Sequence, residues 1–263
     1  MDDLARRALA VNQAMLALGN EVFQADGATF VRNGELPSER DGNFVADVAA
    51  ATPAEIERLL ARVEREFAGV PYRRFEVDFT TPPAFEARLV LDGYQRDEAL
   101  LLVLEGALAG EPRPYEIRPV VDESGWQARA ELVAESWREY EQRAGRAEDL
   151  AAALRAGRAK SPPMRYWLAC VDGRPRAYGA SWSGIDGVGQ VEYLFTHPEF
   201  RGRGLATALI HRGVADCRER GAGPVVITAG AWDTPKQMYA ALGFRPVAVK
   251  RSYWKAVGAE RPS

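Results

Sequence analysis

The chain has 263 residues, of which 47% are hydrophobic and 27% are charged, and its formal net charge at pH 7 is −3. This is the composition of an ordinary globular protein, with enough residues for one large core or two small ones. Because the chain has no overall basic field, its composition gives no indication of a nucleic-acid partner.

Residue runs and the rare residue types exclude several further classes. No apolar run reaches the roughly 18 residues of a membrane-spanning helix, and the acidic start is unlike a secretory leader. Cys170 and Cys217 are far apart, so a disulfide framework is not expected; with His197 and His211 they also lack metal-ligand spacing. We therefore expect a cytoplasmic protein with no membrane association and no metal.

The first half of the chain alternates strand and helix patterns. A strand pattern over 43–48 precedes a capping box, Thr52-Pro53-Ala54-Glu55, and a helix whose apolar face continues to Phe67. The later elements expected are a strand over 74–79, a short helix over 82–92 and a strand over 99–104.

Residues 106–114, with the sequence GALAGEPRP, contain several glycine and proline breaks and no periodicity. Such a segment is typical of a linker. We therefore expect a first domain over 1–108, a linker over 109–113 and a second domain over 114–263.

The second half is a longer succession of strands and helices. In chain order we expect a strand over 115–120, helices over 126–140 and 147–156, strands over 166–171, 177–183 and 190–196, a helix from Leu205, a strand over 224–229, a helix after the capping box Thr234-Pro235-Lys236-Gln237, and a strand over 247–254. Asp172-Gly173 and Asp186-Gly187 fit hairpin turns between the middle strands. The last five elements repeat the strand–helix–strand–helix–strand order of the first half. This order indicates an architectural repeat, with a chance coincidence of α/β patterns as the alternative.

The segment 200–207, FRGRGLAT, stands between a strand and a helix. A helix N-terminus offers unpaired N–H groups and the positive end of a dipole to an anion. Gly202 and Gly204 allow unusual backbone angles and a close approach, while Arg201 and Arg203 add charge-assisted donors. The segment therefore predicts a diphosphate-binding turn. It lacks Gly-Lys-Ser/Thr and Gly-x-Gly-x-x-Gly, which argues against a generic nucleotide site.

These features resemble the Gcn5-related N-acetyltransferase (GNAT) superfamily over Tyr115 to Trp254. The family's pyrophosphate motif, Arg/Gln-x-x-Gly-x-Gly/Ala, is matched by RGRGLA at 201–206, with Pro198 ahead of it. A second motif, Tyr-x-x-x-Gly-Phe, is matched by YAALGF at 239–244. The chain departs from the family at Trp232-Asp233, where an asparagine is common.

The resemblance implies an α/β fold of the acyl-CoA N-acyltransferase type, a mixed central sheet flanked by helices, in two tandem copies. The first half looks like a degenerate copy, because no Arg-x-x-Gly turn follows Val48. The resemblance thus implies that only the second half binds acetyl-CoA in the family's manner.

The activity implied is an acetyl-CoA-dependent N-acetyltransferase that transfers the acetyl group to the amine of a small molecule by direct attack on the thioester. A non-catalytic acetyl-CoA-binding sensor or interaction module is the alternative. By resemblance, backbone amides of the glycine turn hold the pyrophosphate, and the strand end at Leu194 pairs with the pantetheine arm. The residues expected at the coenzyme are Leu194, Phe195, Thr196, Arg201, Gly202, Arg203, Gly204, Leu205, Ala206, Thr207 and Asp233.

Two residues are candidates for proton transfer. An alkylammonium must lose a proton before it attacks, because its ordinary pKa is about 10.4. Strand alternation predicts that Glu192 shares a face with Gln190 and Leu194, so Glu192 is the candidate base; the alternative is a surface glutamate paired with an arginine. The resemblance implies that Tyr239 protonates the leaving thiolate; a packed aromatic is the alternative. The acceptor amine, and the choice between monomer and homodimer, stay open.

Overall fold

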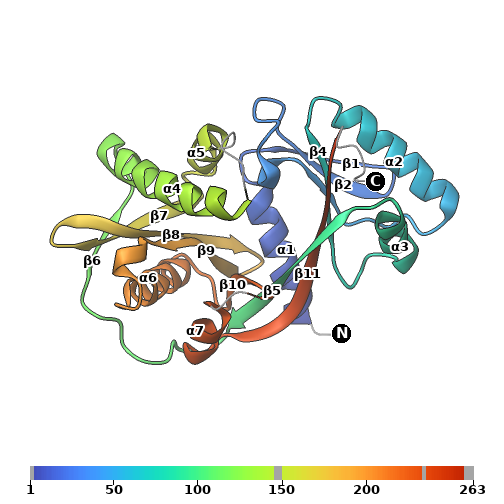
Figure 1. Cartoon of the computed structure of the whole chain (residues 1–263). Coiled ribbons are helices and arrows are strands. Elements are labelled where there is room, and N and C mark those ends of the chain that lie inside the picture. The colour runs from blue at the N-terminus through green and yellow to red at the C-terminus, as the bar shows by residue number, and fades with distance from the viewer. Residues whose placement is uncertain (1–2, 145–149, 233–234, 258–263) are drawn as a thin grey trace. The chain divides into compact units, whose positions relative to one another are not determined.

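The computed structural model describes residues 3–144, 150–232 and 235–257. Its strands join in one mixed sheet that is flanked by helices (Figure 1). Packing divides the chain into two compact units. Unit 1 consists of Met1–Met15 and Leu101–Ala248, and unit 2 of Leu16–Leu100 and Val249–Ser263. The boundaries of these two units differ from those of the domains that the sequence predicts on either side of the linker.

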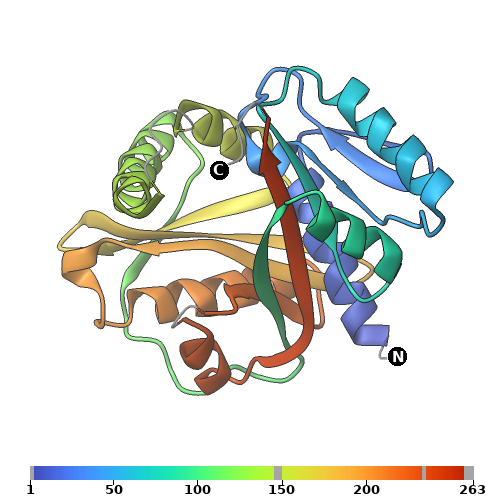
Figure 2. The same ribbon diagram turned by 45° about the vertical axis from the view of Figure 1, so that its right-hand side comes forward.

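Unit 2 contains the elements of the first half of the chain. They are strands β1 (Glu21–Ala25), β2 (Ala28–Arg32) and β3 (Phe44–Ala46), the 3-10 turn η1 (Arg40–Gly42), helix α2 (Pro53–Glu66), strand β4 (Tyr72–Val77), helix α3 (Pro83–Leu91), the first part of β5 (Gln95–Leu104) and the last part of β11 (Arg245–Ala256). β11 runs antiparallel to β4, and β3 runs parallel to it. Helices α2 and α3 lie on the same face of these strands (Figure 2), where Leu59, Phe75 and Phe85 share one buried core.

Helix α2 begins at the capping box expected from the sequence. The Thr52 hydroxyl accepts a hydrogen bond from the Glu55 amide, and the Glu55 carboxylate accepts from the amides of Thr52, at 2.9 Å, and Ala51, at 3.1 Å. The prediction is therefore confirmed. These two side chains thus satisfy amides at the start of α2 that the helix itself leaves without partners.

Two elements at the beginning of the chain were not expected. Helix α1 covers Asp3–Ala17, and β1 and β2 form an antiparallel hairpin. The hairpin turn is Asp26-Gly27, with φ values of 48° and 74°. These angles match those at Asp172-Gly173, so the Asp-Gly dipeptide is the sequence signal of this hairpin turn as well.

Unit 1 holds the remaining elements, together with most of α1. They are strand β6 (Glu116–Pro119), helices α4 (Glu123–Ala144) and α5 (Leu150–Ala159), strands β7 (Met164–Val171), β8 (Arg174–Ile185) and β9 (Val188–Thr196), the 3-10 turn η2 (Pro198–Phe200), helix α6 (Leu205–Glu219), strand β10 (Val225–Gly230) and helix α7 (Pro235–Ala241). The strands are ordered β5-β10-β9-β8-β7-β6. Helices α4 and α6 cover opposite faces of them (Figure 1).

Every strand and helix expected from the sequence is present, with ends that differ by no more than about four residues. Both expected hairpins are also confirmed, since β7 pairs antiparallel with β8 and β8 with β9. The order strand–helix–strand–helix–strand occurs as β3-α2-β4-α3-β5 and again as β9-α6-β10-α7-β11. A tandem duplication as its origin stays a prediction.

Candidate active site

The glycine turn lies between η2 and α6, as its sequence predicts. Gly202 has a φ of 70°, and Gly204, the N-cap of α6, has a φ of 92°. Both angles are in the left-handed region that favours glycine. No side chain caps α6, and a Cβ added at Gly202 would meet nothing within 4 Å. Unlike α2, this helix therefore has no side chain bonded to its first amides, which leaves them available to a ligand.

The two arginines of the turn have different surroundings. The Arg201 guanidinium donates to both carboxylate oxygens of Glu139, and its Nε donates to the Thr196 carbonyl at 3.1 Å. Arg201 thus ties the turn to β9 and α4. The Arg203 guanidinium lies 4.9 Å from the centre of the Phe200 ring, while its carbonyl accepts from the Tyr115 hydroxyl at 2.7 Å.

β9 and β10 are parallel and pair only over their first residues. The pairs are Gly189 with Val225, Gln190 with Val226 and Val191 with Ile227. Beyond them no pairing between the two strands is present in the described residues. The backbone groups of the last part of β9 are therefore available on this side, as an additional extended segment would require.

A β-bulge in β9 lies at this opening. Ala180 of β8 pairs with Glu192 and Tyr178 pairs with Phe195, so β9 has one extra residue. Tyr193 takes a φ of 56°. A Cβ at Gly179 would come within 2.8 Å of Leu194 Cδ2, so the glycine on the neighbouring strand makes room for the bulge.

The bulge makes one sequence expectation wrong. Val191 faces α6, since a Cβ at Gly213 would meet it at 2.9 Å, and Leu194 also packs on α6. Glu192 therefore points to the other face and does not share a face with Leu194. Its carboxylate accepts hydrogen bonds from the Thr228 hydroxyl and from Gln190 Nε2, each at 2.8 Å.

A cavity of ≈ 780 Å³ extends from this opening to the glycine turn. Its lining contains most of the residues expected at the coenzyme: Leu194, Phe195, Thr196, Arg201, Gly202, Gly204, Leu205, Ala206 and Thr207. Glu192 and Arg203 are not part of the lining. Asp233, like Thr234 of the second capping box, lies outside the described residues.

Five residues of the lining were not expected: Ser136, Glu139, Phe200, Pro235 and Met238. Ser136 and Glu139 come from α4, which is distant in sequence and has no motif. Pro235 and Met238 come from the first turns of α7. Their signal was available, because they lie one helical turn or less from Tyr239, on the same short helix.

Tyr239 is brought to the cavity by α7 and is only 6% exposed. Gly243, with a φ of 99°, follows the end of this helix, and the Phe244 amide donates back to the Tyr239 carbonyl at 3.0 Å. This is the left-handed helix ending that glycine permits. The centres of the Tyr239 and Phe244 rings are therefore 6.3 Å apart, which explains why the second motif has these two aromatic residues at its ends.

The two cysteines of the chain do not line this cavity. Cys170 and Cys217 are both buried and free. Burial raises the pKa of Cys217 to about 12, which keeps it a thiol. Within the described residues no cluster of histidine, cysteine and carboxylate side chains is arranged to hold a metal ion. Among the helices of this part of the chain, none combines the length and apolarity needed to cross a membrane.

The architecture is shared with known acetyltransferase structures. The chain is similar to a GCN5-related N-acetyltransferase from Kribbella flavida, at 21% identity and a TM-score of 0.73, over 98% of this chain and 97% of that one. It is also similar to a conserved protein of unknown function from Staphylococcus epidermidis ATCC 12228, at 13% identity and a TM-score of 0.69, over 90% and 94% of the two chains. A tandem GNAT protein from the clavulanic acid biosynthesis pathway matches over 97% of both chains, at 13% identity and a TM-score of 0.58.

A family model matches the second half of the chain. Residues 126–244 match the model of the acetyltransferase (GNAT) family. No curated protein matches the chain significantly. Residues 126–244 are thus similar to the GNAT family, and the fold of the chain over nearly its whole length is similar to that of the Kribbella flavida structure.

Proposed function

We propose that the protein transfers an acetyl group from acetyl-CoA to the amine of a small molecule. The observation that carries this proposal is one cavity bounded by an uncapped helix end, an opened strand edge and a buried tyrosine. Acetyl-CoA matches the three in order, since it carries a pyrophosphate, a pantetheine arm and a thioester. Its fit is supported by the two left-handed glycines, which carry no side chains of their own at the turn.

The chain holds the coenzyme through its backbone in this proposal. The amides of 202–206 donate to the pyrophosphate oxygens at the positive end of the α6 dipole. Backbone groups of Leu194 to Thr196 pair with the amides of the pantetheine arm. The bulge turns one amide near Leu194 toward the thioester oxygen, where it stabilises the negative charge that develops during acyl transfer.

Tyr239 and Glu192 move the protons. The Tyr239 hydroxyl donates to the sulfur as it leaves, and its burial in the cavity excludes competing water donors. Because Glu192 is not in the cavity lining, it accepts the amine proton through water. Its hydrogen bonds from Thr228 and Gln190 fix the orientation of the carboxylate for this step.

The test is steady-state acetyl transfer to a panel of amines and amino acids, followed as free CoA thiol. Wild type should turn over at least one acceptor, and Tyr239→Phe should lose about 10²-fold or more in kcat. Titration calorimetry should show unchanged acetyl-CoA binding in this variant. Tight acetyl-CoA binding with no turnover of any acceptor would instead favour a non-catalytic sensor, and equal binding of ATP or NAD would refute the coenzyme assignment.

A further inference from the structure

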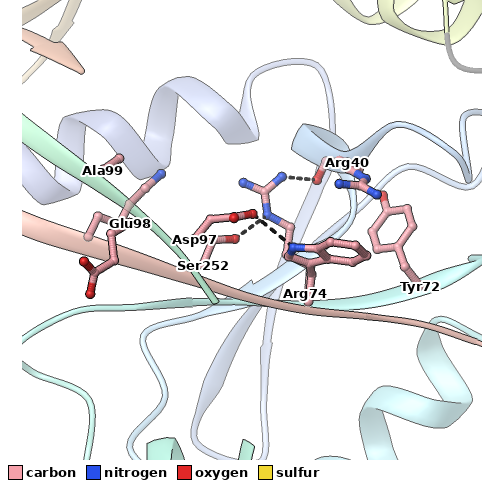
Figure 3. Close-up of a pocket in the computed structure, with 9 residues that line it drawn as sticks. Arg40, Tyr72, Arg74, Asp97, Glu98, Ala99 and Ser252 are labelled. Atoms are coloured by element: carbon pink, nitrogen blue, oxygen red, sulfur yellow. Dashed lines mark hydrogen bonds between the residues drawn. The ribbon is translucent and has the colours of Figure 1, made fainter. Parts of the chain in front are cut away.

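A second cavity lies within unit 2 and shares no residue with the proposed active site. Its volume is ≈ 220 Å³, smaller than the ~300–1,000 Å³ of sites for drug-sized ligands. Strands β4, β5 and β11 and the turn η1 supply its lining: Arg40, Tyr72, Arg74, Asp97, Glu98, Ala99, Lys250, Ser252 and Trp254 (Figure 3).

A network of charges adjoins this cavity through its lining residues Arg74 and Lys250. Glu76 is buried and pairs with Arg74 at 2.7 Å and with Lys250 at 3.0 Å. Arg74 also pairs with Asp41 at 3.0 Å and donates to the Ser252 hydroxyl. These two cations and two carboxylates compensate one another, as burial of charges requires.

Arg40 stands outside that balance. Its backbone is fixed, because Arg74 donates to its carbonyl at 2.9 Å (Figure 3) and the Tyr72 hydroxyl donates to the preceding carbonyl of Glu39. Its guanidinium lies over the Trp254 ring at 4.5 Å and over the Tyr72 ring at 5.8 Å. No described residue accepts a hydrogen bond from this guanidinium or forms an ion pair with it. Stacking leaves its N–H donors directed sideways, in the arrangement that grips a carboxylate.

Asp97 is the corresponding anion. One of its oxygens accepts the indole N–H of Trp254 at 3.0 Å, and no described cation lies within ion-pair distance of it. Glu98 is different, because its side chain points away from the cavity (Figure 3) and pairs with Arg96 at 3.5 Å. The cavity thus offers one uncompensated cation and one uncompensated anion, both in contact with the same indole.

We propose that this cavity binds a small amino acid as its zwitterion. Arg40 holds the carboxylate by paired hydrogen bonds, Asp97 holds the ammonium group, and Trp254 provides the flat wall between them. A ligand with a single charge leaves either Arg40 or Asp97 uncompensated, so the site selects for both charges together. This site is independent of acetyl transfer and gives the half without a glycine turn a binding role.

The test observes Trp254 itself, in the full chain and without acetyl-CoA. The protein is labelled with 5-fluorotryptophan, and the Trp254→Phe variant assigns the Trp254 resonance in the ¹⁹F spectrum. The twenty standard amino acids are titrated first; the tightest binder is then compared with its deaminated acid and its decarboxylated amine. We expect saturable shifts of the Trp254 resonance with the amino acid, and binding at least tenfold weaker for both single-charge analogues.

Matched variants separate the two contacts. Arg40→Ala should weaken binding of the amino acid at least tenfold, so that the amino acid binds no better than its decarboxylated amine. Arg40→Lys retains the charge and should weaken this binding less. Asp97→Asn keeps an acceptor for the indole N–H. In this variant the amino acid should bind no better than its deaminated acid. Tyr239→Phe, in the other cavity, should leave the affinity for the amino acid unchanged, although it lowers kcat for acetyl transfer. No shift with any amino acid at 20 mM, or equal binding by folded Arg40→Ala, would overturn the proposal, whatever the outcome for acetyl transfer.

Discussion

Replacing Gly204 by glutamate tests the proposed pyrophosphate site most directly. The residue has a φ of 92° at the N-cap of α6. Any side chain there costs about 1–2 kcal/mol of stability, because the left-handed region is strained for L residues. A Cβ would meet Arg113 Cδ at 3.4 Å, and that flexible side chain can move aside. The variant should therefore fold, with a melting temperature a few degrees lower.

Its effect on acetyl-CoA should be far larger. A carboxylate about 4 Å from a phosphate charge is repelled by roughly 4 kcal/mol at an effective dielectric constant of about 20. At 1.4 kcal/mol per tenfold change, this weakens binding by about 10³-fold. Gly221→Glu is the matched control, since Gly221 has the same φ of 92°, follows the other end of α6, and has no atom within 4 Å of an added Cβ. Calorimetry with acetyl-CoA gives the answer: unchanged affinity in Gly204→Glu, or an equal loss in Gly221→Glu, would refute the reasoning.

Three further predictions concern the bulge, the coenzyme and the buried charges. Gly179→Ala should displace Leu194 and lower kcat/KM at least tenfold, while Gly69→Ala, with open space around it, should not; equal effects on activity would contradict the role of the bulge. Because acetyl-CoA binds the folded chain and not the unfolded one, acetyl-CoA at 100 times its Kd should stabilise the wild type by about 2.7 kcal/mol in thermal melts, and an unchanged melting temperature would contradict this. Burial raises the pKa of Glu76, but Lys250 and Arg74 outweigh it and lower this pKa to about 2. The stability that Glu76 contributes is therefore present above its unfolded pKa of about 4.3 and is lost as the pH falls toward 2. Glu76→Gln should lower the free energy of unfolding by about 3–5 kcal/mol at pH 7 and reduce its further loss in acid. Urea titrations at several pH values would show both effects.

Local signals in the sequence predicted most of the secondary structure. The capping box at Thr52 and the Asp-Gly turns depend on residues within a few positions of one another, so a short window contains the whole cause. The hairpin turn at Asp26-Gly27 has the same angles, so the same local signal is present there as well. The glycine turn is predictable for the same reason, because all of its residues lie within one short segment.

Other features depend on partners that are far apart in the chain. The bulge in β9 exists because Gly179, on the preceding strand, leaves space for Leu194, and period-two alternation within β9 cannot reveal this. The sequence therefore does not predict the face on which Glu192 lies. The charge network of unit 2 joins Asp41 of η1, Arg74 and Glu76 of β4 and Lys250 of β11, three segments that are far apart in the sequence.

The division of β5 and β11 between the units has a practical consequence for anyone who wishes to study the two halves apart. A fragment that ends at residue 108 lacks Val249–Ser263 of unit 2, and a fragment that begins at residue 114 lacks the Met1–Met15 segment of unit 1. The first fragment would expose the edge of β4 that β11 covers, which favours aggregation, and the second would lack the buried apolar residues Ala8, Val11 and Met15 of α1. Co-expression of the two pieces, or a circularly permuted gene, is the appropriate way to separate their roles.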